Sequence, residues 1–388
     1  MWHAVRMRVA VVAGPEAGHA VPALALCRKL VAAGDHPVFF SDGRWLDVAR
    51  DSGIEARKLG GLAPREFDDD TDSGSKIHGR AAHVSTALLP DLRAVAPDLV
   101  VSDVITVGGG MAAERLGVPW VELSPHPLYL PSKGLPPIGS GLAPGTGMRG
   151  RVRDTVLRAM TAPAIRKGRD QRGEARASVG LPFDDPGPAA RLVATLPALE
   201  VPRPDWPANA YVVGPLVWEP ADNVLEPPPG EGPLIVLAPS TASTGAGGML
   251  DTAIRALDGL GVRMLVTLFE TPDIELPDWV RAGYGRQDEM LRHASALVCG
   301  AGHGVLAKGL LAGVPLVTVP GGGDQWEVAN RVVRQGSGVL IRPLTVDALR
   351  DGVRRVLGDP TFAAAARRAA DGVADVADAV EVCRSVAG

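Results

Sequence analysis

The sequence predicts an α/β protein with two tandem Rossmann-like domains. Short apolar runs rich in β-branched residues alternate with amphipathic stretches of helical spacing, which indicates parallel sheets buried on both faces. A proline-rich segment without periodicity divides this alternation near the middle of the chain. With 388 residues, 46% of them hydrophobic, the chain can bury two cores of roughly 200 residues each.

The first domain is predicted to span residues 1–215. Its amphipathic stretches include 22–33 and 109–116, and each ends at a glycine, as a helix C-cap prefers. Strands and helices in alternation form βαβ units, and these units build a parallel sheet. The predicted strands of this domain are 8–14, 37–41, 99–104, 120–123, 191–195 and 210–213.

A linker is predicted at 216–232, because prolines cluster there and no periodicity is present. The second domain is predicted to span 233–365. The Ala-rich stretch 361–386 has helical spacing and is predicted to form one or two helices, and a C-terminal helix at 366–388 can pack back on the first domain. The predicted strands of the second domain are 234–238, 263–268, 296–299, 316–319 and 338–341.

A long segment of the first domain, 125–150, is rich in glycine and proline and has no periodicity. Loops of this length in compact domains are usually either functional or mobile. Two interpretations therefore stay open: a loop that lines a binding site, and plain disorder.

The amino-acid composition of the chain excludes some classes of function. The net charge of −4 gives no basic face of the kind that nucleic acids require, so no nucleic-acid partner is expected. Three widely separated cysteines show no pairing pattern, which is typical of the reducing cytoplasm. The longest charge-free stretch that we considered, 309–323, is too short and too often broken by glycine and proline to span a bilayer. We expect a cytoplasmic protein without stable membrane insertion, and a homodimer is compatible with this organisation.

His19 follows the first predicted strand, at the carboxyl edge of the sheet. Ligands of open α/β sheets bind at that edge, because its loops and helix N-termini face a common crevice. Asp103 ends another predicted strand and reaches the same edge. Two interpretations of His19 stay open here, a chemical role and a structural role at the start of a helix.

The second domain carries a sharper motif. A predicted strand leads into Gly300-Ala-Gly-His-Gly304 and a helix, and the next strand leads through Pro320 and three glycines to Asp324 and Gln325. Glycines at the start of a helix let a diphosphate approach backbone N–H groups and the positive end of the helix dipole. The pattern indicates a site for a nucleoside diphosphate.

The stretch "GVPLVTVPGGGDQ" at 313–325 resembles the sugar-binding motif of family 1 glycosyltransferases, the UDP-glycosyltransferase-like inverting enzymes of the GT-B fold. The likeness extends over most of the chain: the Gly18-His19 loop, 97–104, 117–124, 211–216 and 283–291. The resemblance is to the type found in actinobacterial natural-product, antibiotic and lipid biosynthesis. It implies a GT-B fold and a hexosyltransferase activity.

The resemblance implies two substrates. One is a nucleoside diphosphate sugar, with UDP or dTDP favoured over GDP, and the other is a hydroxyl of a small, largely apolar acceptor such as a natural product or lipid. Two alternatives stay open: a sugar-nucleotide epimerase of the same fold, and a catalytically silent homologue that binds a ligand or partner. An NAD-dependent oxidoreductase is disfavoured, because the G-x-G-x-x-G fingerprint is absent.

The resemblance also assigns roles to individual residues. His19 becomes the base that takes the proton of the acceptor hydroxyl, and Asp103 the carboxylate that holds its tautomer. Asp324 and Gln325 become the donor-sugar contacts, while His126 and Tyr129 are candidates for the acceptor pocket. The predicted contacts of the donor nucleotide and diphosphate are Ser240, Thr241, Tyr284, Arg286, Gln287, Gly302, His303, Gly304 and Val305.

Two departures from the family pattern concern the donor. The family usually has a diphosphate-binding histidine at the position of Gly300 and an acidic ribose contact at the position of Lys308. His303 could supply the missing phosphate contact or could be a surface residue at the start of a helix. Lys308 could meet a phosphate or face solvent. No metal cofactor is predicted, because the helix N-terminus takes the place of a metal, and the acidic stretch 68–72 is interpreted as a solvated loop.

Overall fold

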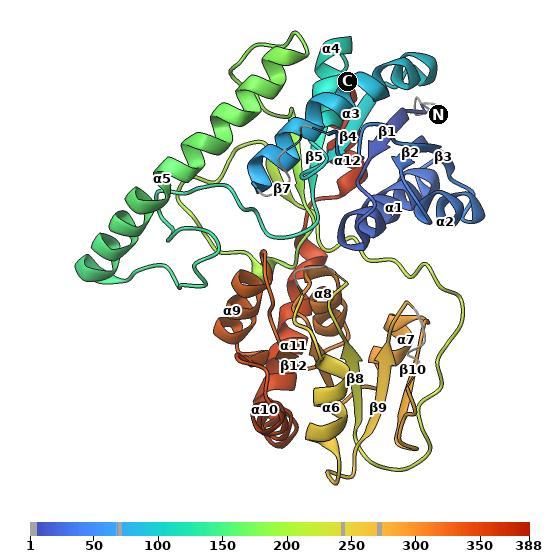
Figure 1. Ribbon diagram of the computed structural model, residues 1–388, viewed down its shortest axis with the longest axis vertical. Coiled ribbons are helices and arrows are strands. Elements are labelled where there is room, and N and C mark those ends of the chain that lie inside the picture. The colour runs from blue at the N-terminus through green and yellow to red at the C-terminus, as the bar shows by residue number, and fades with distance from the viewer. Residues whose placement is uncertain (1–5, 67, 69–71, 242–244, 270–273) are drawn as a thin grey trace.

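The structure is a computed structural model that describes residues 6–66, 68, 72–241, 245–269 and 274–388. Two parallel β-sheets, each flanked by helices, lie one above the other in Figure 1. The connecting chain, yellow-green in Figure 1, passes down one side from the first domain to the second. The two sheets confirm the predicted fold class.

The upper sheet has seven strands in the order β3-β2-β1-β4-β5-β6-β7, all parallel. Central strands are fully buried because helices cover both faces, which explains their continuous apolar sequences. The strands are β1 (Arg8–Val12), β2 (His36–Ser41), β3 (Glu55–Lys58), β4 (Leu99–Asp103), β5 (Trp120–Ser124), β6 (Ala190–Val193) and β7 (Ala210–Val212). Its helices are α1 (Ala17–Ala32), α2 (Trp45–Asp51), α3 (Ser73–Val95), α4 (Gly108–Leu116) and α5 (Gly147–Ser178).

The lower sheet has six parallel strands in the order β10-β9-β8-β11-β12-β13. The strands are β8 (Leu234–Ala238), β9 (Arg263–Thr267), β10 (Val280–Gly283), β11 (Ala296–Cys299), β12 (Leu316–Thr318) and β13 (Gly338–Leu340). The helices that follow are α6 (Met249–Leu257), α7 (Gln287–Arg292), α8 (His303–Leu311), α9 (Gln325–Gln335), α10 (Val346–Gly358), α11 (Pro360–Asp371) and α12 (Ala379–Ala387).

The last helix returns to the first domain. Val380, Val382 and Cys383 of α12 are buried in the same core as α1 and β1. Arg384 adds an ion pair to the buried Asp35, with 3.1 Å between Nη2 and Oδ2. The red α12 accordingly lies within the upper domain in Figure 1.

Strands β3 and β10 and helix α5 are among the elements that were not predicted. Edge strands β3 and β10 carry charged residues and lack the continuous apolar pattern of the central strands. Helix α5 is 32 residues long and rich in arginine, so it has no regular apolar face. The segment predicted as one loop at 125–150 is irregular up to residue 146 and then enters α5. Among the described residues, no helix is both long and apolar enough to cross a bilayer.

Each sheet has one point where the strand order reverses direction. In the upper sheet the chain builds outward from β1 to β3 on one side and from β4 to β7 on the other, so the switch point lies between β1 and β4. In the lower sheet it lies between β8 and β11. Loops diverge at such points and leave a crevice where ligands of open α/β sheets bind.

Candidate active site

His19 and Asp103 meet at the switch point of the upper sheet. His19 lies in the first turn of α1 after β1, and Asp103 is the last residue of β4. The imidazole Nδ1 lies 2.8 Å from the carboxylate Oδ2. Asp103 is 1% exposed, and its Oδ1 accepts hydrogen bonds from the Ile105 N–H and the Thr106 hydroxyl. Both carboxylate oxygens are therefore engaged, and the imidazole is held with Nε2 available for chemistry.

The charge around His19 favours the protonated ring. Burial alone would lower the pKa of His19, but the nearby carboxylates, above all Asp103 and to a smaller extent Glu16 and Asp324, together raise the pKa above its usual value. With Nδ1–H donated to Asp103, the neutral ring has its lone pair on Nε2. The arrangement can accept a proton from a nearby hydroxyl and stabilise the resulting imidazolium.

His126 and Tyr129 form an aromatic wall beside His19. Their rings stack with centroids 4.4 Å apart, and the His126 ring stands edge-on to His19 at 6.4 Å. The His126 Nδ1 lies 2.8 Å from the Pro127 carbonyl, which fixes the ring, and burial lowers its pKa. The structure thus brings both candidate acceptor residues to the candidate base.

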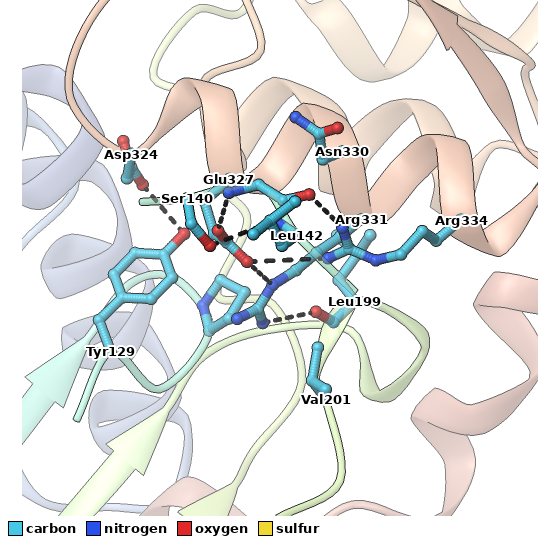
Figure 2. A network of polar contacts seen from close by, with 12 residues as sticks. Tyr129, Ser140, Leu142, Leu199, Val201, Asp324, Glu327, Asn330, Arg331 and Arg334 are labelled. Atoms are coloured by element: carbon cyan, nitrogen blue, oxygen red, sulfur yellow. Dashed lines mark hydrogen bonds and ion pairs between the residues drawn. The ribbon is translucent and has the colours of Figure 1, made fainter. Parts of the chain in front are cut away.

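Tyr129 also reaches the second domain. Its hydroxyl lies 3.4 Å from Oδ2 of Asp324, the N-cap residue of α9, as Figure 2 shows. Burial, together with the neighbouring Asp324 carboxylate, raises the pKa of Tyr129 well above its usual value, so the hydroxyl stays protonated and donates. One hydrogen bond therefore joins a candidate acceptor residue to a candidate donor-sugar residue.

Gln325 and Ser240 lie together at the switch point of the lower sheet. The buried Gln325 amide donates to the Ser240 hydroxyl at 2.9 Å and accepts the Gly321 N–H at 2.9 Å. Gly300 ends the neighbouring turn, and a Cβ there would lie 2.7 Å from the Ser240 Cβ and backbone N. The Ser240 turn thus closes on Gly300 so tightly that the family's histidine would not fit without a backbone shift.

One side of the first turn of α8, at Gly302 and Gly304, faces open space. A Cβ at Gly302 or Gly304 would meet no atom within 4 Å. The N–H groups of the first helical residues have no partner within the helix, and the helix dipole adds positive potential there. The backbone N–H groups of Gly302, Gly304 and Val305 can accordingly donate to an anion. Thr241, which directly follows Ser240, is exposed.

His303 requires a correction. Its side chain is 8% exposed, and its Nε2 lies 2.9 Å from the Thr195 hydroxyl of the first domain. Burial lowers the pKa of His303 to about 3, and a hydrogen bond with the Pro125 backbone only partly opposes this effect. The imidazole is thus neutral and packed between the domains, and the hypothesis that it meets a phosphate has no support in this geometry.

The buried His303 makes acid stability testable. The unfolded chain binds a proton here as pH falls below about 6.5, whereas the folded state does not until about pH 3. This contribution to folding is therefore complete above pH 6.5 and is lost as pH falls, by at most about 2 kcal/mol at pH 5. We expect the Tm, measured by circular dichroism, to fall less in His303→Gln than in the wild type when the pH is lowered from 7 to 5. Exposed His36→Gln is the control, and an equal loss in all three proteins would contradict the assignment.

Tyr284, the aromatic residue of the predicted nucleotide site, is partly exposed and lies beside Phe269, which was not predicted. The ring of Tyr284 lies 5.6 Å from that of Phe269, and the two side chains are 38% and 37% exposed. Arg286 turns away from this pair toward Asp288 and Glu289, and the Asp288 carboxylate raises the pKa of Arg286. The Arg286 guanidinium is thus occupied by carboxylates of α7.

The partner of Lys308 is a residue that was not predicted, Glu219. The Lys308 ammonium lies 2.7 Å from Glu219 Oε1, and it also donates to Gln287 Oε1 at 3.0 Å. Gln287 in turn donates to Thr267 Oγ1 at 3.0 Å. Glu219 and Lys308 are only 11% and 13% exposed, so Lys308 does not face solvent. No local sequence signal marks Glu219, because it is a linker residue that becomes part of the site only when the linker crosses α7 and α8.

Metal ligands do not gather in the described part of the chain: there, no three His, Cys, Asp or Glu side chains could hold a metal ion together. Of the acidic stretch 68–72, residues 69–71 lie outside the described residues. Asp72 caps α3 by accepting the N–H groups of Gly74 and Ser75, and it pairs with Lys167.

Comparisons with known proteins extend over the whole chain. Residues 256–387 match the family described as erythromycin biosynthesis protein CIII-like, C-terminal domain. The chain is 30% identical over 419 aligned residues to 4'-demethylrebeccamycin synthase of Lentzea aerocolonigenes, covering 96% of this chain and 99% of that protein. Its structure is similar to the glycotransferase of kitacinnamycin, with a TM-score of 0.74, 22% identity, and coverage of 98% and 97%. It is also similar to glycosyltransferase VinC in complex with dTDP, with a TM-score of 0.70, 22% identity, and coverage of 98% and 99%.

Proposed function

Because this chain belongs to the family of GT-B glycosyltransferases that includes 4'-demethylrebeccamycin synthase, we propose that it moves a sugar from a UDP- or dTDP-sugar to a hydroxyl of a small, largely apolar acceptor. The observation that carries this proposal is the His19–Asp103 pair, which lies at the switch point beside Tyr129 and Asp324. A dTDP donor is supported by the structural likeness to VinC, which was solved with that nucleotide. The stacked His126 and Tyr129 rings support an apolar acceptor.

The proposed reaction is a single displacement with inversion. The Nε2 atom of His19 takes the proton of the acceptor hydroxyl while the hydroxyl oxygen attacks the anomeric carbon of the donor sugar. The bond between that carbon and the diphosphate oxygen breaks, and the diphosphate leaves with the electron pair. Asp103 stabilises the imidazolium that forms at His19.

Backbone and hydroxyl donors would stabilise the leaving group. Its new negative charge would be met by the first-turn N–H groups of α8 and by the Ser240 and Thr241 hydroxyls. Asp324 and Gln325 would hold the hydroxyls of the donor sugar and fix its pose. On this proposal the positive end of α8 takes the place of a metal ion, and no metal cofactor is required.

Donor binding is the first experiment. We expect UDP or dTDP to bind with micromolar affinity in isothermal titration calorimetry without metal, and GDP and NAD to bind more weakly. Gln287→Ala should weaken that binding by about tenfold, because it removes a charge-assisted contact to Lys308 as well as a nucleoside contact. Arg255→Ala, in an exposed ion pair with Asp251, is the control.

The same experiment separates the alternatives. Binding of none of the four ligands would favour the catalytically silent homologue. The epimerase alternative finds no support among the relatives described above, and it would require loss of the donor sugar without any acceptor.

Three buried free cysteines, Cys27, Cys299 and Cys383, support a cytoplasmic location.

A further inference from the structure

The segment that carries His126 and Tyr129 crosses from the first domain to the second. We define this acceptor loop as residues 125–146, between β5 and α5. Its second half lies on α9, where the Trp326 indole N–H donates to the Ser140 carbonyl at 3.2 Å. The Gly141 N–H donates to Glu327 Oε2 at 2.9 Å, and Arg334 donates to the Gly141 carbonyl at 2.7 Å. Figure 2 shows Ser140 and Leu142, the two neighbours of Gly141, beside Glu327 of α9.

Gly141 fits this place because it has no side chain. Its φ of +69° is a backbone conformation that favours glycine. A Cβ on Gly141 would lie 2.4 Å from the Trp326 Nε1 atom and 2.6 Å from the Asn330 Nδ2 atom. Gly139 has a similar φ of +84°, yet a Cβ there would meet no atom within 4 Å. The close approach to α9 is thus specific to Gly141.

Glu327 is a buried charge with a defined set of partners. It is 5% exposed, and its Oε1 accepts from Arg331 Nε at 3.2 Å. Arg331 is 4% exposed and also donates to the Leu199 carbonyl of the first domain at 2.9 Å. A buried carboxylate of this kind is costly unless it is paired and hydrogen-bonded. The partners of Glu327 are Arg331 and Arg334 of its own helix α9 and Gly141, the one that belongs to the acceptor loop.

The position of Glu327 on α9 ties the loop to the donor side. Asp324 and Gln325, the candidate donor-sugar contacts, begin the same helix two or three residues earlier. Tyr129, at the other end of the acceptor loop, bonds to Asp324. The loop is therefore fixed to α9 at both ends, and His126, which lies against His19, is held between the domains.

We propose that Glu327 is a positioning residue for sugar transfer: by holding Gly141, it fixes the acceptor loop against the helix that carries the donor-sugar contacts. This inference rests on the proposed function. Glu327 touches neither substrate in this proposal. It acts on the acceptor side, because the loop that it holds carries the aromatic wall beside the base. The loop, held in this place, also keeps water away from the donor sugar.

Two variants test the contact from its two sides. Glu327→Ala removes the acceptor of the Gly141 N–H, and Gly141→Ala places a Cβ against the Trp326 and Asn330 side chains of α9 and strains the backbone of the loop. In both, kcat/KM for the acceptor should fall about tenfold to a hundredfold, as expected for a misplaced reactant. The KM for the donor should change less than about twofold, and hydrolysis of the donor sugar should take a larger share of turnover. A purely structural defect would lower the binding of both substrates together.

Hydrogen exchange measures the contact without any substrate. Amides of peptides covering 130–146 should exchange faster in Glu327→Ala and Gly141→Ala than in the wild type. Gly139→Ala carries the same kind of backbone strain without the contact, and Arg255→Ala removes an exposed ion pair of the second domain, so both should keep the protection.

The outcomes are distinguishable. Unchanged loop protection in Glu327→Ala, or equal loss in Gly139→Ala and Gly141→Ala, would overturn the proposed contact. Faster exchange with unchanged acceptor kinetics would overturn the positioning role. A wild type that binds no nucleotide and transfers no sugar would instead contradict the proposed function, whereas the exchange result would still report on the contact.

Discussion

Replacing His19 with alanine is expected to lower kcat for sugar transfer by about a thousandfold or more, because the acceptor hydroxyl then loses its base in the transition state. Binding of dTDP or UDP should change by less than about twofold, since the proposed nucleotide contacts lie on the second domain. The measurement is the initial rate at saturating donor and acceptor, combined with calorimetric binding of the nucleotide.

The control for this variant is His36→Ala. His36 is exposed at the amino end of β2, whereas the site lies at the carboxyl ends of the strands. Its removal should therefore leave the rate unchanged. Circular dichroism would verify that both variants fold. Transfer by His19→Ala at the wild-type rate would refute the assignment of the base, whereas parallel losses of transfer and nucleotide binding would indicate a structural role for His19.

The meeting of the two candidate catalytic residues could be predicted because it follows from sheet topology. Buried parallel strands have continuous apolar sequences, so β1 and β4 were recognisable, and residues that end such strands must share one edge. His19 and Asp103 therefore came together as expected, with 2.8 Å between Nδ1 and Oδ2. The same reasoning failed for β3 and β10, because edge strands need no apolar pattern on both faces.

Contacts between the domains could not be predicted in this way. His303 was expected either at a phosphate or at the surface, yet it is buried against Thr195 of the other domain. Glu219 and Glu327 were missed because their partners, Lys308 and Gly141, lie far away in the sequence. The Glu327–Gly141 pair depends on how the two domains pack together, and the Glu219–Lys308 pair depends on where the linker crosses the second domain. No local periodicity indicates either.

The Asp103→Asn variant should separate orientation from charge at the base. The amide cannot hold the Nδ1–H tautomer of His19 as a carboxylate does. The value of kcat/KM on the plateau of its pH profile should therefore fall by about 10²- to 10⁴-fold. The pH profile adds an independent readout. In the wild type, kcat/KM should fall as pH drops through the pKa of His19, because the imidazolium cannot accept a proton.

The expected sign of the shift follows from the causes of the His19 pKa. Burial lowers this pKa, and Asp103 together with Glu16 and Asp324 more than compensates for it, so removing the Asp103 carboxylate leaves burial as the larger effect. The acidic limb of the profile should therefore move to lower pH in Asp103→Asn, even as the plateau falls. A lower plateau with an unmoved limb would mean that Asp103 only supports the fold around His19. A moved limb with an undiminished plateau would mean that Asp103 sets the charge of the ring without holding its tautomer, and the base would then need another orienting group.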